Sequence, residues 1–128
     1  MRVILDTHAF LWFIMGDARL SASARGLIED AQNERLVSAG SLWEIAVKVS
    51  IGKLTLTEPF DVIIPRELSQ NGIQILPITV AHLSVLCGLP FRHRDPFDRL
   101  LIAQAMAENV PLVSADAIVG AYPVSRLW

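Results

Sequence analysis

The stretch DPFDRLLIAQAMAENVPLVSAD, residues 95–116, holds the pattern that decides the fold. Its opening Asp-Pro pair is typical of a helix start, because proline is favoured at the first helical position. Residues 96–108 are apolar on almost every side, which is typical of a helix buried all round. The short apolar run at 111–114 then predicts a buried strand. A buried helix that leads into a buried strand is the unit from which α/β proteins are built.

The same alternation of short apolar strands and helices runs along the rest of the chain. Strands are predicted at 3–5, 35–38, 73–77, 111–114 and 124–127. Helices are predicted at 8–15, 21–31, 41–52, 60–70, 79–87 and 96–108. Apolar strands that alternate with helices indicate a parallel sheet covered on both faces. We therefore predict an α/β fold of three layers, with a central short-stranded parallel sheet flanked by helices.

Length and composition indicate one folded domain over residues 1–128. The composition is 52% hydrophobic, which excludes intrinsic disorder and leaves enough apolar surface that we expect self-association or a partner. Cys87 is the single cysteine, so no disulfide framework or cysteine-based metal cluster is available. No stretch approaches the roughly 20 apolar residues of a membrane span, and no leader is recognisable. We expect a cytoplasmic protein without membrane contact.

Of the 13 acidic residues, three are predicted at one edge of the sheet, and Asp98 joins them if its helix begins at the same edge. Asp6 and Asp116 directly follow strands, whereas Glu44 and Asp98 lie near the starts of helices. The carboxyl ends of parallel strands share the edge at which open α/β sheets bind ligands. Each acid also has an ordinary alternative as a helix cap or turn residue, and Glu44 could complete a capping box with Ser41 or form an i, i+4 pair with Lys48.

Four converging carboxylates would repel one another unless a cation lay between them. Carboxylates, waters and substrate phosphate are the usual oxygen ligands of Mg²⁺ and Mn²⁺. Such metals activate water and stabilise charge in the hydrolysis of phosphate esters. The net charge of −2 argues against a broad basic face for nucleic acid, but the rest of the molecule carries +2 once these four acids are set aside.

Several motifs occur in the order and at the spacing of a known family. Asp6-Thr7-His8, VSAGSLWEIAVKVSIGKL (37–54), DPFDRLLIAQA (95–105), LVSAD (112–116) and SRLW (125–128) resemble PIN domains, above all the VapC-like toxins of bacterial toxin–antitoxin pairs. The resemblance implies a metal-dependent endoribonuclease that acts on RNA, forms a homodimer and is silenced by a VapB-type antitoxin. It makes the four acids the catalytic and metal-binding set: Asp6, Glu44, Asp98 and Asp116.

Three polar residues are expected to support the acids. Thr7 could orient the carboxylate of Asp6 beside it. Ser114 stands where the family has a Thr or Ser two residues before the last acid. Arg99 is expected to pair with a neighbouring carboxylate, with a contact to substrate phosphate as the alternative.

Other cationic residues are assigned by position along the chain. Arg92 and Arg94, on the loop before the helix at 96–108, are predicted to contact RNA, with an ordinary solvated loop as the alternative. His8, His82 and His93 show no metal-binding spacing. No histidine or lysine is expected to be placed for proton transfer.

Apolar residues give two further expectations. Trp43 lies in apolar sequence and is expected to pack in the core. The stretch 10–15, with exposed parts of the helix at 60–70, is where a partner helix would dock. The pattern leaves an antitoxin groove, a dimer face and ordinary core packing all open.

Other functions remain open at this stage. The same acids could serve a nuclease that acts on DNA or another nucleic acid, or a phosphatase. A silent domain that only binds its partner is a further alternative. A receiver-type signalling domain is disfavoured, because the third strand ends in Pro77-Ile78-Thr79 without a phosphoacceptor aspartate and Lys48 and Lys53 are the only lysines.

Overall fold

The strands form one five-stranded sheet in which every neighbouring pair runs parallel. The computed structural model describes all residues 1–128. The strands are β1 (Arg2–Leu5), β2 (Glu34–Ser38), β3 (Gln74–Leu76), β4 (Leu112–Val113) and β5 (Arg126–Leu127), in the order β3-β2-β1-β4-β5. β1 lies at the centre because Ile4 pairs with Leu36 on one side and with Leu112 on the other. The predicted parallel sheet is confirmed.

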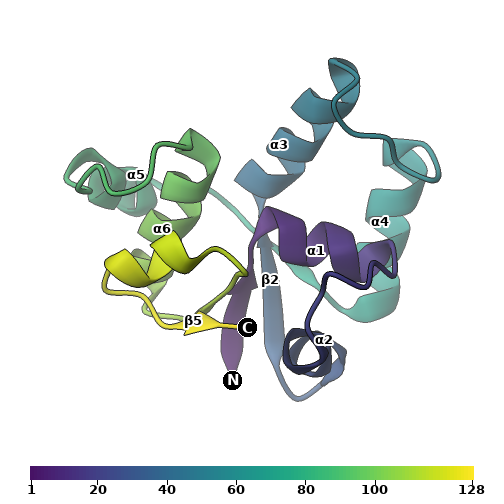
Figure 1. The fold of residues 1–128 in the computed structure, drawn as a ribbon, viewed down its shortest axis with the longest axis horizontal. Coiled ribbons are helices and arrows are strands. Elements are labelled where there is room, and N and C mark those ends of the chain that lie inside the picture. The colour runs from purple at the N-terminus through teal and green to yellow at the C-terminus, as the bar shows by residue number, and fades with distance from the viewer.

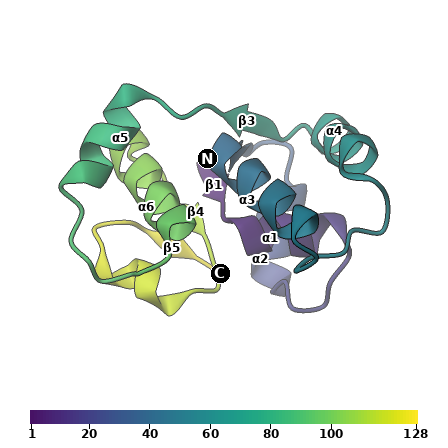
Figure 2. The same ribbon diagram turned by 90° about the horizontal axis from the view of Figure 1, so that it is seen from above.

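Helices cover both faces of this sheet. They are α1 (Thr7–Ile14), α2 (Ala22–Glu29), α3 (Ala39–Ser50), α4 (Phe60–Asn71), α5 (Val80–Cys87) and α6 (Pro96–Glu108), with a short 3-10 helix η1 (Ala117–Ala121). α1 to α4 lie on one side of the sheet and α5, α6 and η1 on the other (Figures 1 and 2). None of these helices is long and apolar enough to cross a membrane.

Two cores lie on either side of the sheet, and alternate strand residues enter them. Leu5 and Val37 join the core beneath α1 to α4, whereas their neighbours Ile4 and Leu36 join the core beneath α6. This follows from the geometry of a strand, in which successive side chains point to opposite faces. The predicted arrangement of three layers is confirmed.

The start of α3 differs from the prediction. Ser38, at the end of β2, caps the helix by accepting the backbone N–H of Gly40, so the helix begins two residues before Ser41. The capping box predicted between Ser41 and Glu44 therefore does not form. A Cβ atom on Gly40 would lie 2.6 Å from the side chain of Leu100 in α6. This glycine lets the first turns of α3 and α6 approach closely at the carboxyl edge of the sheet.

Trp43 is not a core residue. Its side chain is 61% exposed, and its ring packs edge-on against Phe97 at the start of α6, with 5.2 Å between ring centroids. Both rings line an apolar hollow of about 300 Å³ between α3, α5 and α6. In the stretch 10–15, the first two residues are buried in the core and the others are half-buried or exposed.

Candidate active site

Three of the four predicted acids line one hollow at the carboxyl edge of the sheet. Asp6 follows β1, Asp116 follows β4, and Asp98 lies in the first turn of α6. Together with His8 and Trp12 they line a cavity of about 280 Å³. The shared edge of parallel strands brings these residues together although they lie far apart in the sequence.

Glu44 is held in a separate hydrogen-bond network and does not line that cavity. Its carboxylate is 3% exposed. The Thr7 hydroxyl donates to Oε1 at 2.7 Å, and the Lys48 ammonium lies 2.6 Å from Oε2. The expectation that Thr7 orients Asp6 is therefore wrong. Its side chain projects from the first turn of α1 toward α3, where it supports Glu44. The Ser41 hydroxyl lies 2.9 Å from the Thr7 hydroxyl and completes the network.

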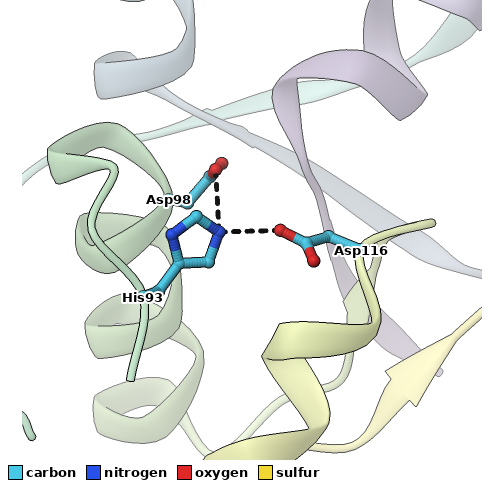
Figure 3. A group of neighbouring side chains, drawn as sticks. All are labelled: His93, Asp98 and Asp116. Atoms are coloured by element: carbon cyan, nitrogen blue, oxygen red, sulfur yellow. Dashed lines mark hydrogen bonds and ion pairs between the residues drawn. The ribbon is translucent and has the colours of Figure 1, made fainter. Parts of the chain in front are cut away.

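An imidazole lies between two of the acids (Figure 3). Nε2 of His93 is 2.7 Å from Oδ2 of Asp116 and 3.2 Å from Oδ2 of Asp98. The backbone N–H of Asp95 donates to Nδ1 at 3.1 Å, so Nδ1 carries no proton. The neutral ring then carries its proton on Nε2 and donates it toward the two carboxylates. His93 thus lies beside two of the acids although its spacing in the sequence gives no sign of such a place, and the expectation that no histidine serves in proton transfer stays a prediction.

The loop that carries His93 is irregular but firmly held. The Tyr122 hydroxyl accepts the backbone N–H groups of Arg92 and His93, each at 2.9 Å. The same hydroxyl donates to the carbonyl of Pro90 at 2.7 Å. The side chains of Arg92 and Arg94 are exposed on this loop, and their contact with RNA stays a prediction.

Arg99 supports the same loop and pairs with no carboxylate. Its buried guanidinium donates to the carbonyls of Leu89 and Pro90 at 3.1 and 2.9 Å. The expected ion pair is absent because successive residues of a helix point about 100° apart, so Arg99 faces away from the cavity that Asp98 lines. Its effect on the site passes through the position of the loop.

The Asp98 carboxyl is the least stabilised charge of the site. Burial raises its pKa to about 7, and the neighbouring charges of Asp95, Glu44 and Asp6 act in the same direction. The interaction with His93 opposes them only in part. A carboxylate in these surroundings lacks a compensating positive charge.

The other two acids of the cavity differ from each other. Burial raises the pKa of Asp6, against a hydrogen bond with the Ser114 hydroxyl. Partial burial would also raise the pKa of Asp116, but hydrogen bonds from the Ile118 N–H and the His93 ring hold it below its usual value. Ser114 also accepts the backbone N–H of Asp116 at 3.0 Å. It therefore touches both acids, as its predicted supporting role requires.

Comparison with known proteins places the chain in a family. Residues 3–123 match the PIN domain family, which is almost the whole chain. The chain belongs to the PIN domain family. Over 68 residues it is 37% identical to Ribonuclease VapC16 of Mycobacterium tuberculosis. That alignment covers 50% of this PIN domain chain and 48% of the relative, so it spans about half of the relative's length.

Solved structures share the fold of this PIN domain. A chain of VapBC2 from Rickettsia felis, bound to a DNA fragment from its promoter, superposes with a TM-score of 0.72 at 19% identity and covers 99% of this chain and 98% of its own. A chain of a toxin–antitoxin complex from Klebsiella pneumoniae gives a TM-score of 0.64 at 13% identity, with 98% and 96% covered. At these identities the likeness establishes the fold, as predicted.

The donor set of this PIN domain fits a hard divalent cation. Ligand atoms of His93, Asp98 and Asp116 lie within 4.8 Å of one another, and Asp6 lines the same cavity. Carboxylate oxygens are the ligands that Mg²⁺ and Mn²⁺ prefer. Because Nε2 of His93 carries a proton, His93 serves as a donor that orients the acids and not as a ligand. Burial and the neighbouring acids disfavour the charged form of Asp98, and a cation bound among these oxygens would offset that effect.

Proposed function

We propose that this PIN domain is a metal-dependent endoribonuclease of the VapC type, the toxin of a toxin–antitoxin pair. The observation that carries the proposal is the convergence of Asp6, Asp98 and Asp116 in one hollow, where burial raises the pKa of Asp6 and Asp98. The likeness to a curated ribonuclease supports RNA as the substrate. RNA as the substrate would place the protein in the cytoplasm.

The four acids have distinct roles in this proposal. Asp6 and Asp98 would hold Mg²⁺ or Mn²⁺, Asp116 would contribute directly or through water, and Glu44, held by Thr7 and Lys48 outside the cavity, would add its negative charge near Asp98. A bound cation of this kind supplies a Lewis acid that activates water and stabilises the charge developing on the phosphate. The acids must be deprotonated to act, and Asp98 reaches that state only near neutral pH when no cation is bound.

His93 and Ser114 keep the acids in place for this chemistry. The Nε2–H of His93 donates to Asp116 and points toward Asp98, which fixes the direction of both carboxylates. Ser114 links the loops that follow β1 and β4 through Asp6 and Asp116. Such outer contacts tune the affinity of a metal site by orienting its ligands.

A VapB-type antitoxin and a second copy of the chain are the proposed protein partners. The antitoxin is supported by the solved relatives, one of which is a toxin–antitoxin complex. The homodimer is supported by exposed apolar side chains, including Trp43 at the hollow between α3, α5 and α6. Apolar patches of this kind are typical of protein interfaces.

The decisive test is cleavage of RNA by the purified protein with Mg²⁺ or Mn²⁺. We expect cleavage that EDTA abolishes and that Asp6→Asn and Asp98→Asn each lower by about a hundredfold or more. Asp61→Asn, the same change in the exposed first turn of α4, is the matched control and should leave the rate unchanged. Equal rates in all four proteins, or cleavage that survives EDTA, would overturn the metal site.

Two further outcomes separate the alternatives. Cleavage of DNA with no cleavage of RNA would show a nuclease of another specificity. Absence of all cleavage, with binding to the antitoxin retained, would show a silent partner-binding domain. In cells, expression without the antitoxin should arrest growth, and Asp98→Asn should relieve the arrest.

A further inference from the structure

A second and larger hollow adjoins the acid cavity. It has a volume of about 510 Å³ and lies between α1, the loop after α1 and the end of α3. His8 and Trp12 line both this hollow and the cavity of the acids. The volume lies within the range of small-molecule binding pockets, about 300 to 1,000 Å³. The two hollows are therefore neighbours that meet at these two side chains.

The second hollow is lined by cationic side chains, unlike the acid cavity. Two of them are already paired: Arg19 with Asp17 at 2.7 Å, and Lys48 with Glu44 at 2.6 Å. Lys53 is exposed, lines the hollow and has no carboxylate within 4.0 Å. Its charge is free to meet an anion beside the proposed metal centre.

Flat rings form the boundary between the two hollows. His8 is exposed and Trp12 is half-buried on the same face of α1, with 5.5 Å between ring centroids and 40° between ring planes. Rings of this kind stack with nucleic-acid bases largely without regard to sequence. A free cation and an exposed ring beside an acidic metal site match the alternating phosphate and base of a single strand.

We propose that this hollow is a nucleotide subsite that holds the RNA next to the scissile phosphate. Lys53 contacts a backbone phosphate, and the ring of His8 stacks with the neighbouring base. The inference rests on the proposed function, since it assigns the substrate's path through the same site. Such a subsite favours single-stranded RNA, because only unpaired bases can stack on a protein ring.

The test compares Lys53→Ala with Arg2→Ala. Arg2 begins β1, so this control removes one positive charge at the opposite edge of the sheet. With a short labelled single-stranded RNA, Lys53→Ala should raise both the Kd and the KM by about threefold to tenfold while kcat is retained. The dependence of log Kd on log salt should become shallower by about 0.7, the value for one lost phosphate contact on a single strand. Arg2→Ala should match the wild type in all four quantities.

A second pair of variants tests the ring. His8→Ala should weaken RNA binding by about tenfold, the effect of one lost stacking contact. His8→Phe keeps a flat ring and should restore most of the affinity. Equal weakening by both variants would argue against stacking and overturn the role of His8.

The outcomes distinguish this subsite from the function on which it rests. If the wild type cleaves RNA and Lys53→Ala behaves as Arg2→Ala does, the subsite is wrong and the nuclease stands. If the wild type binds RNA through Lys53 but cleaves nothing, the subsite stands and the nuclease falls. If Lys53→Ala weakens binding of the antitoxin and leaves RNA binding unchanged, the hollow is a protein-docking surface and the subsite is wrong.

Discussion

Two carboxylates on neighbouring helices have opposite surroundings. Glu44 on α3 is almost fully buried, yet both of its oxygens meet donors, Thr7 and Lys48. Asp98 on α6 is more exposed, but it has no lysine or arginine as a partner: its close neighbour is the ring of His93, and burial raises its pKa to about 7. The structure thus pairs the more deeply buried Glu44 carboxylate with a lysine and leaves the Asp98 carboxyl without such a partner.

In the proposed metal site, this difference separates an acid that the protein itself neutralises from one that a bound cation would neutralise. A buried carboxylate without donors would destabilise the fold severely, so the deepest acid is given its own lysine. Asp98, nearer the surface, can remain without a cationic partner, because it can bind a proton until a cation arrives. We therefore expect a bound cation to change the protonation of Asp98 and to leave the network around Glu44 as it is.

The largest expected effect is on the Asp98 side, through His93. His93→Ala removes the donor that orients both Asp98 and Asp116, so we expect Mn²⁺ affinity to fall about tenfold to a hundredfold. His93→Gln, which keeps a side-chain N–H donor, should recover part of the loss. Calorimetric titration with Mn²⁺ measures both variants. Unchanged affinity in His93→Ala would show that the acids are oriented without the ring.

A smaller effect is expected on the Glu44 side, through Lys48. Lys48→Met leaves the buried Glu44 carboxylate with the Thr7 hydroxyl as its remaining donor, so the free energy of unfolding should fall by about 2 kcal/mol. The double variant with Glu44→Gln should recover most of that loss, because no unpaired charge remains. Urea denaturation of the two single variants and the double variant gives the coupling. Strictly additive changes would show that the pair contributes nothing as a pair.

The smallest effect is the pH dependence of stability without metal. The pKa of Asp98 is near 3.8 in the unfolded chain and about 7 in the folded protein, so between these values the folded protein holds more protons. The free energy of unfolding should therefore fall as the pH rises from about 4 to about 7. Asp98→Asn should lessen that fall by about 1 kcal/mol, a value reduced for the partial exposure of the group.

Thermal denaturation in EDTA at pH 5 and pH 8 measures this dependence. Saturating Mg²⁺ should reverse it for the wild type, because the cation binds the deprotonated acid and stabilises the folded state. Asp61→Asn again serves as the control and should follow the wild type. A wild-type protein that becomes more stable toward pH 8 in EDTA would contradict the raised pKa of Asp98.

The sequence predicts the elements and the edge at which the acids meet, but not the partners of individual side chains. The Asp-Pro start of α6 and the buried runs of β1 and β4 are local patterns, and they place Asp6, Asp98 and Asp116 correctly at the sheet edge. The position of His93 depends on a hydroxyl supplied by Tyr122, far along the chain. No local pattern indicates such a contact.

The other errors have the same origin. Thr7 is next to Asp6 in sequence but bonds to Glu44, because α1 packs beside α3. Arg99 turns away from the acid that precedes it, since the loop carbonyls lie on that side of α6. The sequence does offer one sign that His93 lies near the acids. It is two residues before Asp95, which caps the helix that carries Asp98.

The pairing of β1 with β4 joins the first strand of the chain to a strand near its end. Pairing strands so distant along the chain costs more loop-closure entropy than a local contact does, and such topologies fold more slowly. Asp6 and Asp116 follow these two strands at the same edge of the sheet, so they come together only when β1 and β4 pair. A folding intermediate that lacks β4 cannot assemble the acids, and the onset of activity during refolding should report the closure of the sheet.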